Sequence, residues 1–145
     1  MPRLTGELQR LTMCMRQYKN KLLAPYGIGC RSAQILHYIE LIPDCSQETL
    51  AEMLMLDKST IARRLAMLEE KGFLLRTPNP ADRRGQLLSL TPKGKELFPV
   101  IQDVNKKWFD FLTEGEDPEE LDRMERTLAK LLQKAQDYLK GDEAT

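Results

Sequence analysis

The sequence predicts a mainly α-helical fold with one small two-stranded β-hairpin. Helix-forming residues dominate the composition, and aromatic residues make up only 6% of the chain. Apolar residues recur every three or four positions toward both ends of the chain, which is the period of an amphipathic helix. One stretch, at about residues 73–91, changes to short apolar runs separated by turn residues, as expected for strands.

The N-terminal part of the chain is expected to form two helices. The first spans about residues 2–24 and has apolar residues at heptad spacing: Leu4, Leu8, Leu11, Met15, Tyr18 and Leu22. Pro25 and Gly27 should end it. A second helix is expected from about Ser32 to Ile42, where another proline follows.

Two short helices should follow in close succession. The first, QETLAEMLML, has the good N-cap residue Ser46 before it and is expected to bury Leu50, Met53 and Leu54. The second, KSTIARRLAMLEEKG, begins after the plausible cap Asp57 and has two faces. Its core stripe consists of Ile61, Leu65 and Leu68. At about 100° per residue, a separate arc gathers Thr60, Arg63, Arg64, Met67 and Lys71.

The β-hairpin is expected after Gly72, a natural residue for the end of a helix. FLLRT and LLSLT read as antiparallel strands, and PNPADRRG reads as the loop between them. A long hairpin tip of this kind should be exposed. At such a tip, Arg83 and Arg84 are not expected to pack against a hydrophobic core.

Two longer helices are expected within about residues 92–140. Thr91 and Pro92 form a cap and first turn, although Pro99 should kink this helix or delay its regular start. The last helix should start at Asp117, again followed by proline. Both repeat the heptad spacing of the N-terminal helix, so all three could close as a bundle within one chain. We instead expect the helices at 2–24 and 92–140 to be dimerisation helices that also pack against a second subunit.

Charge is segregated along the chain although the formal net charge is zero. Residues 57–95 contain nine Lys or Arg and four Asp or Glu, whereas residues 96–145 contain seven and thirteen. No Cys and His spacing indicates a metal site, and no paired carboxylates or phosphate-binding glycine loop indicate an enzyme, so we expect no cofactor, no metal and no catalytic residue. A cytoplasmic protein without membrane contact is expected, because no signal peptide or membrane-length apolar run is present.

Two short helices followed by a hairpin with a basic tip predict a winged helix-turn-helix at about residues 31–95. In this motif the second helix enters the DNA major groove. Arginine can chelate guanine there, and Ser59 and Thr60 can contact phosphates or either type of base. An ordinary solvated face is the alternative for Arg63 and Arg64, but neither has an acidic partner one turn away within Thr60 to Arg64. A winged-helix module that binds protein and not DNA remains a further alternative.

The stretch SQETLAEMLMLDKSTIARRLAMLEEKGFLLRTPNPADRRGQLLSLTPKGKEL resembles the DNA-binding core of the multiple antibiotic resistance regulator (MarR) family. The resemblance implies a single domain over residues 1–145 and a homodimeric regulator, usually a repressor, on a palindromic operator in double-stranded DNA. It places on the recognition helix Lys58, Ser59, Thr60, Arg63 and Arg64. In the wing it implicates Asp82, Arg83 and Arg84, with Arg84 entering the minor groove and Asp82 orienting it. Lys93 or Lys95 should add phosphate attraction.

Members of this family are usually released from DNA by a small ligand, often phenolic or anionic, or by oxidation. The candidate residues for a pocket that binds an aromatic or anionic effector are Arg16, Tyr18, His37, Tyr38 and Trp108, each of which could equally serve packing. Cys14, Cys30 and Cys45 do not match the spacing of peroxide-sensing members. Control through a cysteine remains an alternative.

Overall fold

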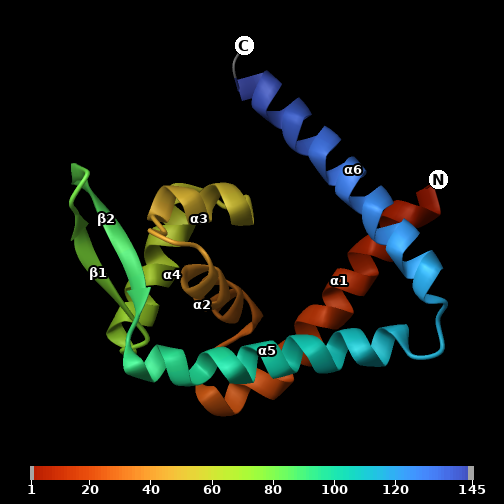
Figure 1. The fold of residues 1–145 in the computed structure, drawn as a ribbon, viewed down its shortest axis with the longest axis horizontal. Helices are drawn as coiled ribbons and strands as arrows, with labels where there is room; N and C mark the ends of the chain where they lie inside the picture. The colour runs from red at the N-terminus through yellow and green to blue at the C-terminus, as the bar shows by residue number, and fades with distance from the viewer. Residues whose placement is uncertain (1, 144–145) are drawn as a thin grey trace. The chain divides into compact units, whose positions relative to one another are not determined.

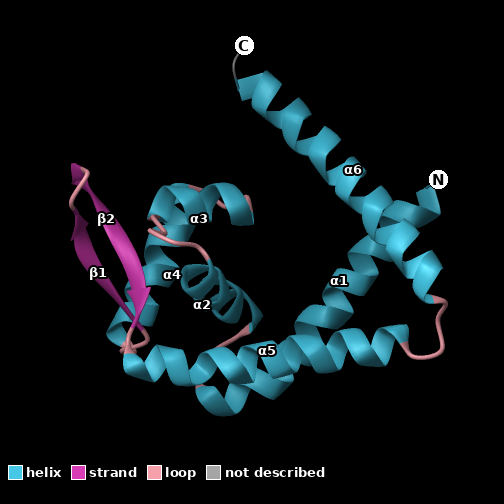
Figure 2. Cartoon of the chain, viewed as in Figure 1, coloured by secondary structure: helices cyan, strands magenta, loops and turns pink. Residues whose placement is uncertain are grey.

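The computed structural model describes residues 2–143 and has the predicted mainly helical fold with one two-stranded antiparallel sheet (Figures 1 and 2). The elements are α1 (Pro2–Leu23), the short 3-10 helix η1 (Ala24–Tyr26), α2 (Cys30–Leu41), α3 (Gln47–Leu54), α4 (Lys58–Glu70), β1 (Leu74–Asn79), β2 (Asp82–Leu90), α5 (Pro92–Thr113) and α6 (Pro118–Glu143). The chain divides into two compact units, one ending at Trp108 and the other beginning at Phe109. Among these residues no helix combines the length and apolar character that a membrane crossing requires.

The core of the first unit lies where α2, α3, α4 and the hairpin pack together (Figure 1). The predicted stripe of α4 is fully buried there, at Ile61, Leu65 and Leu68. The expected burial of Met53 is wrong, because this side chain is 45% exposed. Leu50 and Leu54 form the narrow buried stripe of α3, and Met53 lies about 100° around the helix from Leu54.

Helix ends in the first unit are fixed by side chains. Ser46 caps α3 by accepting a hydrogen bond from the amide of Thr49 at 3.1 Å, as predicted. α2 starts two residues before the predicted Ser32, because the amide of Cys30 donates to Asn20 Oδ1 of α1 at 2.6 Å. This distant side chain provides an acceptor at the start of α2 that the local sequence does not contain.

The junction between α4, the hairpin and α5 is built around Phe73. Gly72 has φ +81°, a left-handed conformation that suits glycine, and the amide of Phe73 bonds the Leu68 carbonyl. At Gly94, in the first turn of α5, a Cβ atom would collide with the carbonyl oxygen of Phe73. Thr91 caps α5 by accepting from the Gly94 amide at 3.1 Å. The base of the hairpin is therefore held against the ends of two helices.

The hairpin is longer than predicted, and the assignment of PNPADRRG as a loop is wrong. The ladder runs from Leu74 opposite Leu90 to Asn79 opposite Asp82, with an irregularity between Pro78 and Asn79. The tight turn between the strands is supported by Asn79 Oδ1, which accepts from the amide of Ala81 at 3.0 Å. Such local side-chain bonds let Asn stabilise a short turn where composition alone indicates a loop.

α5 starts at Pro92 and continues through Pro99, so the expected delay of its start is wrong. Asp117 caps α6 by accepting from the Glu119 amide at 3.0 Å, as predicted. Many apolar side chains of α6 are exposed, among them Met124, Leu131, Leu132, Tyr138 and Leu139. Leu4, Leu8 and Leu11 of α1 are exposed as well.

Candidate nucleic-acid interface

The first turn of α4 is organised by Asp57. Its Oδ1 accepts from the hydroxyl of Ser59 at 2.6 Å and from the amide of Thr60 at 2.7 Å, and its Oδ2 accepts from the Thr60 hydroxyl at 2.8 Å. These hydrogen bonds, with that of Ser59 the strongest influence, hold the pKa of the Asp57 carboxyl well below its usual range. Asp57 is therefore ionised at neutral pH and fixes the hydroxyls of both neighbours.

Two arginines follow one turn later on α4. Arg63 is exposed, and its Nη2 lies 3.4 Å from the hydroxyl oxygen of Thr60. Arg64 is half-buried. Neither guanidinium forms an ion pair with an acid of the part of the chain that the structure describes. Both charges are thus available to an external anion, whereas on an ordinary solvated helix face such charges form ion pairs with neighbouring acids.

Two lysines expected from the sequence to belong to this basic surface instead form contacts within the fold. The amine of Lys71 donates to the carbonyl of Gly27, after η1. The amine of Lys93 donates to the carbonyl of Lys71 at 2.9 Å and lies 4.8 Å from the centre of the Phe73 ring. Lys93 thereby satisfies a carbonyl at the end of α4. Of the two candidates for added phosphate attraction, Lys95 is the one without such a bond, and it is exposed.

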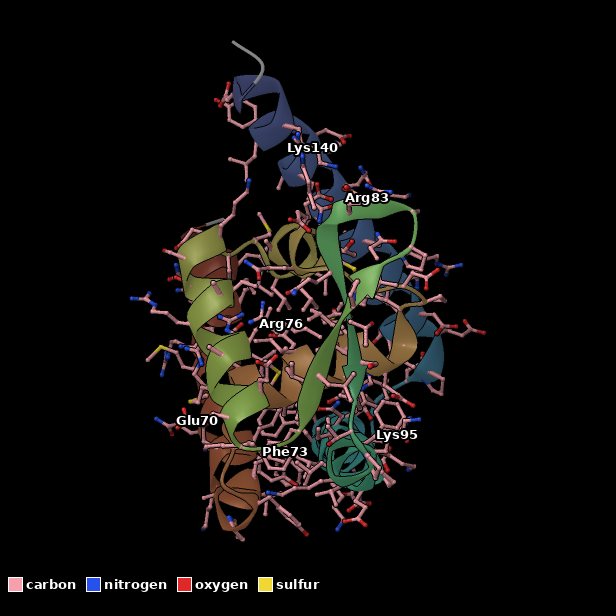
Figure 3. The ribbon with its side chains drawn as sticks, turned by 90° about the vertical axis from the view of Figure 1, so that its left-hand side faces the viewer. Glu70, Phe73, Arg76, Arg83, Lys95 and Lys140 are labelled. Atoms are coloured by element: carbon pink, nitrogen blue, oxygen red, sulfur yellow. The ribbon has the colours of Figure 1, made fainter. Side chains whose placement is uncertain are left out.

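The wing carries its charge on β2. Arg83 and Arg84 are both exposed, and Figure 3 shows Arg83 at the far end of the hairpin. Asp82 Oδ1 accepts from the backbone amide of Arg84 at 3.0 Å. Asp82 thus acts on the main chain that carries Arg84.

Arg76 of β1 links three elements and was missed by sequence reasoning. Its Nε forms an ion pair with Glu69 Oε2 of α4 at 3.1 Å, and its Nη1 donates to Gln47 Oε1 of α3 at 3.3 Å. Figure 3 shows Arg76 in the space between α4 and the hairpin. The available signal was strand alternation, since Arg76 shares the inward face of β1 with buried Leu74 and therefore needs a partner. Arg76 and its two partners are called the Arg76 clamp below.

A polar groove runs along the inner side of the wing and has a volume of about 270 Å³. It is lined by Gln47, Glu48, Arg76, Arg83, Arg84, Gly85, Gln86 and Leu88. Three of these residues are arginines, and only Arg76 has an acidic partner among the described residues. With Glu48 as the one acid among these lining residues, the lining carries a net positive charge.

The five candidate effector residues occur as two aromatic pairs and an exposed arginine, Arg16. The rings of Tyr18 and Trp108 lie 5.0 Å apart. The ring of His37 lies 6.0 Å from that of Tyr38 and stacks on Phe98 of α5 at 5.6 Å. The Nδ1 atom of His37 is buried without a hydrogen-bond partner, and burial, aided by Lys19, lowers the pKa of this imidazole.

The three cysteines differ in their access to solvent. Cys14 is exposed on α1, Cys30 is half-buried and Cys45 is buried, and all three are free thiols. Burial raises the pKa of the Cys45 thiol to about 11. Cys45 is consequently protonated and unreactive at neutral pH.

These elements define a winged helix-turn-helix protein, with α3 and α4 as the helix pair and β1 and β2 as the wing. The sequence model of the MarR family matches residues 31–85. Over nearly its whole length the chain also has the fold of solved MarR-family structures. In sequence over residues 31–85, and in fold over nearly its whole length, the chain is similar to transcription regulators of the MarR family.

Three solved structures illustrate the similarity. A MarR transcriptional regulator from Methanosarcina mazei Go1 is 25% identical with a TM-score of 0.86, covering 95% of this chain and 99% of its own. A structure of MarR is 29% identical with a TM-score of 0.81, covering 96% and 94%. A mutant MarR from E. coli, complexed with operator DNA, is 26% identical with a TM-score of 0.80, covering 89% and 93%.

Proposed function

We propose that this protein is a homodimeric repressor that binds a palindromic operator in double-stranded DNA and is released by a small aromatic or anionic effector. The observation that carries the proposal is a set of arginines on α4 and the wing that form no ion pair among the described residues, namely exposed Arg63, Arg83 and Arg84 and half-buried Arg64, within a winged helix-turn-helix. An operator complex of a 26% identical MarR protein supports the assignment of DNA as the partner.

In the proposed complex, α4 enters the major groove and its N-terminal residues face the base edges. Lys58, Arg63 and Arg64 supply donors for phosphates and for guanine, and Ser59 and Thr60 supply hydroxyl groups. Arg83 and Arg84 lie at the wing, where arginine is attracted to the negative potential of a narrow minor groove. Asp82 holds the backbone of Arg84 in place through the 3.0 Å hydrogen bond.

The exposed apolar residues of α1 and α6 support the proposal of a dimer. Leu4 is 47% exposed and Tyr138 is 70% exposed, and each belongs to a heptad series that a second copy could cover. A two-fold axis would place the two copies of α4 about one DNA turn apart, at roughly 34–36 Å. The spacing of the two operator half-sites should match this distance.

An effector would act from the region of α1, α2 and α5 that contains the two aromatic pairs. Tyr18 and Trp108 offer ring surfaces and a hydroxyl, and His37 offers a buried nitrogen without a partner. Arg16 supplies a cation for an acidic ligand. Oxidation at exposed Cys14 is the alternative route of release.

The test is equilibrium binding of the purified full-length protein to the DNA upstream of its own gene. Binding should weaken steeply as salt increases, because phosphate contacts release counterions. Arg84→Ala should weaken binding to all sequences, whereas Arg64→Ala should relax specificity at one position in each half-site. Absence of binding to any genomic fragment at low salt would instead favour a winged-helix module that contacts protein.

A further inference from the structure

The hydrogen bonds around Asp57 assign a direction to the two hydroxyls at the start of α4. An ionised carboxylate can only accept hydrogen bonds, so the Ser59 and Thr60 hydroxyls must donate to it. Each hydroxyl has a single hydrogen, and at 2.6 Å and 2.8 Å from the carboxylate oxygens both hydrogens are used. What each hydroxyl can still offer to DNA is an acceptor lone pair.

Phosphate oxygens are acceptors and cannot use such a lone pair. The same holds for guanine N7 and O6, adenine N7 and thymine O4 in the major groove. The donors in that groove are the exocyclic amines, N6 of adenine and N4 of cytosine. The fixed hydroxyls are therefore matched to these two amines and mismatched to the other polar groups they would meet.

The other polar side chains on the first turns of α4 cannot take over the role of hydrogen-bond acceptor. Lys58, Arg63 and Arg64 are donors only and cannot accept from an amine. Between Lys58 and Met67 the helix has no Asn or Gln that could accept instead. Thr60 already receives a long contact from Arg63 Nη2 at 3.4 Å, which leaves it one lone pair, whereas exposed Ser59 keeps two.

We infer that Ser59 and Thr60, fixed as acceptors by Asp57, read the exocyclic amine of an adenine or cytosine in each operator half-site. This specificity rests on the proposed function, because it requires α4 to lie in the major groove. Different side chains of α4 would then recognise different kinds of base. The arginines select acceptor-bearing guanine, and the hydroxyls select an amine-bearing base.

The experiment begins with selection of an operator from randomised duplexes by the full-length protein. Single adenines of the half-site are then replaced by purine, which lacks the N6 amine, and single cytosines by 2-pyrimidinone, which lacks the N4 amine. Fluorescence anisotropy measures the ratio of affinities for the normal and the amine-free duplex. At one or two half-site positions this ratio should be about three- to tenfold for the wild-type protein.

The matched variants locate the acceptor. The ratio should fall toward one in Ser59→Ala, in Thr60→Val or in the double variant, and Thr60→Ser should keep it because a hydroxyl remains. Asp57→Asn preserves a good helix cap but adds an amide donor, so a hydroxyl can turn its hydrogen outward and the ratio should also fall. Arg84→Ala should weaken binding to both duplexes equally and leave the ratio unchanged.

The outcomes separate this inference from the proposed function. If no duplex is selected at low salt, the proposed function fails. If the protein binds but no amine deletion changes the affinity, the inference is overturned while the function stands. Retention of the full ratio in the Ser59→Ala, Thr60→Val double variant would also overturn it, since the acceptor would then be the Asp57 carboxylate itself.

Discussion

The Arg76 clamp predicts that removing a negative charge near the proposed DNA-binding surface will weaken DNA binding. Glu69→Ala deletes the carboxylate that holds Arg76 at 3.1 Å. If only long-range charge mattered, loss of an acid on α4 would strengthen attraction to phosphate. If the clamp fixes the wing relative to α4, its loss lets the wing leave the arrangement that binds DNA. The two mechanisms therefore predict opposite signs.

The size of the effect follows from the exposure of the pair. The side chains are 23% exposed for Arg76 and 47% exposed for Glu69, so the ion pair contributes about 0.5–1 kcal/mol. Loss of the ion pair can shift the equilibrium between the DNA-binding arrangement of the wing and its other arrangements by no more than this energy. The apparent affinity should consequently fall about two- to fivefold for each protomer.

Glu70→Ala is the matched control, because it removes the same charge from the next residue, for which no ion pair is found among the described residues. Anisotropy titrations of the upstream DNA, at about 0.15 M salt, should give weaker binding for Glu69→Ala than for wild type. Glu70→Ala should bind as tightly as wild type or more tightly. Equal or tighter binding by Glu69→Ala relative to Glu70→Ala would refute the clamp.

Three further predictions concern stability and reactivity. Gly94→Ala should lower the melting temperature strongly, because its Cβ collides with the Phe73 carbonyl, and an unchanged temperature in thermal unfolding would contradict the close packing. Because the pKa of His37 is lower in the folded protein than in the unfolded chain, the unfolded chain binds a proton at a higher pH, and the free energy of unfolding should fall as the pH decreases below about 6.5. His37→Gln should reduce the difference between the melting temperatures at pH 7.5 and pH 5.5. Buried Cys45 should resist alkylation at neutral pH until the protein unfolds, and rapid labelling of the native protein, followed by mass spectrometry, would contradict this.

Local rules predicted most of the fold because local interactions build it. Ser46, Asp57 and Asp117 cap the helices that they precede in the sequence, and the apolar stripe of α4 is buried at the predicted positions. The start of α2 was missed because Asn20 of α1, ten residues away, accepts from its first amide. The hairpin was predicted too short because Asn79 supports a tight turn within a segment rich in proline.

The basic surface was predicted with less precision, since sequence reveals charge but not its partners. Lys71 and Lys93 appear equivalent to other cations of residues 57–95, yet both donate to backbone carbonyls. Arg76 lies in an apolar strand, and nothing in the sequence around it predicts that it joins α3, α4 and β1. Asp57 was identified as a cap, and only the three-dimensional positions of Ser59 and Thr60 reveal that it also sets the direction of two hydroxyls.

The placement of α4 in the major groove is tested most sharply by chemical protection of guanine N7 by the bound protein on its upstream DNA. N7 lies in the major groove, where α4 is proposed to bind. Two protected patches centred about 10 base pairs apart are predicted, and Arg63→Ala or Arg64→Ala should remove protection at a guanine in each. A single patch, or a pattern that neither substitution alters, would contradict the placement of α4 in the major groove.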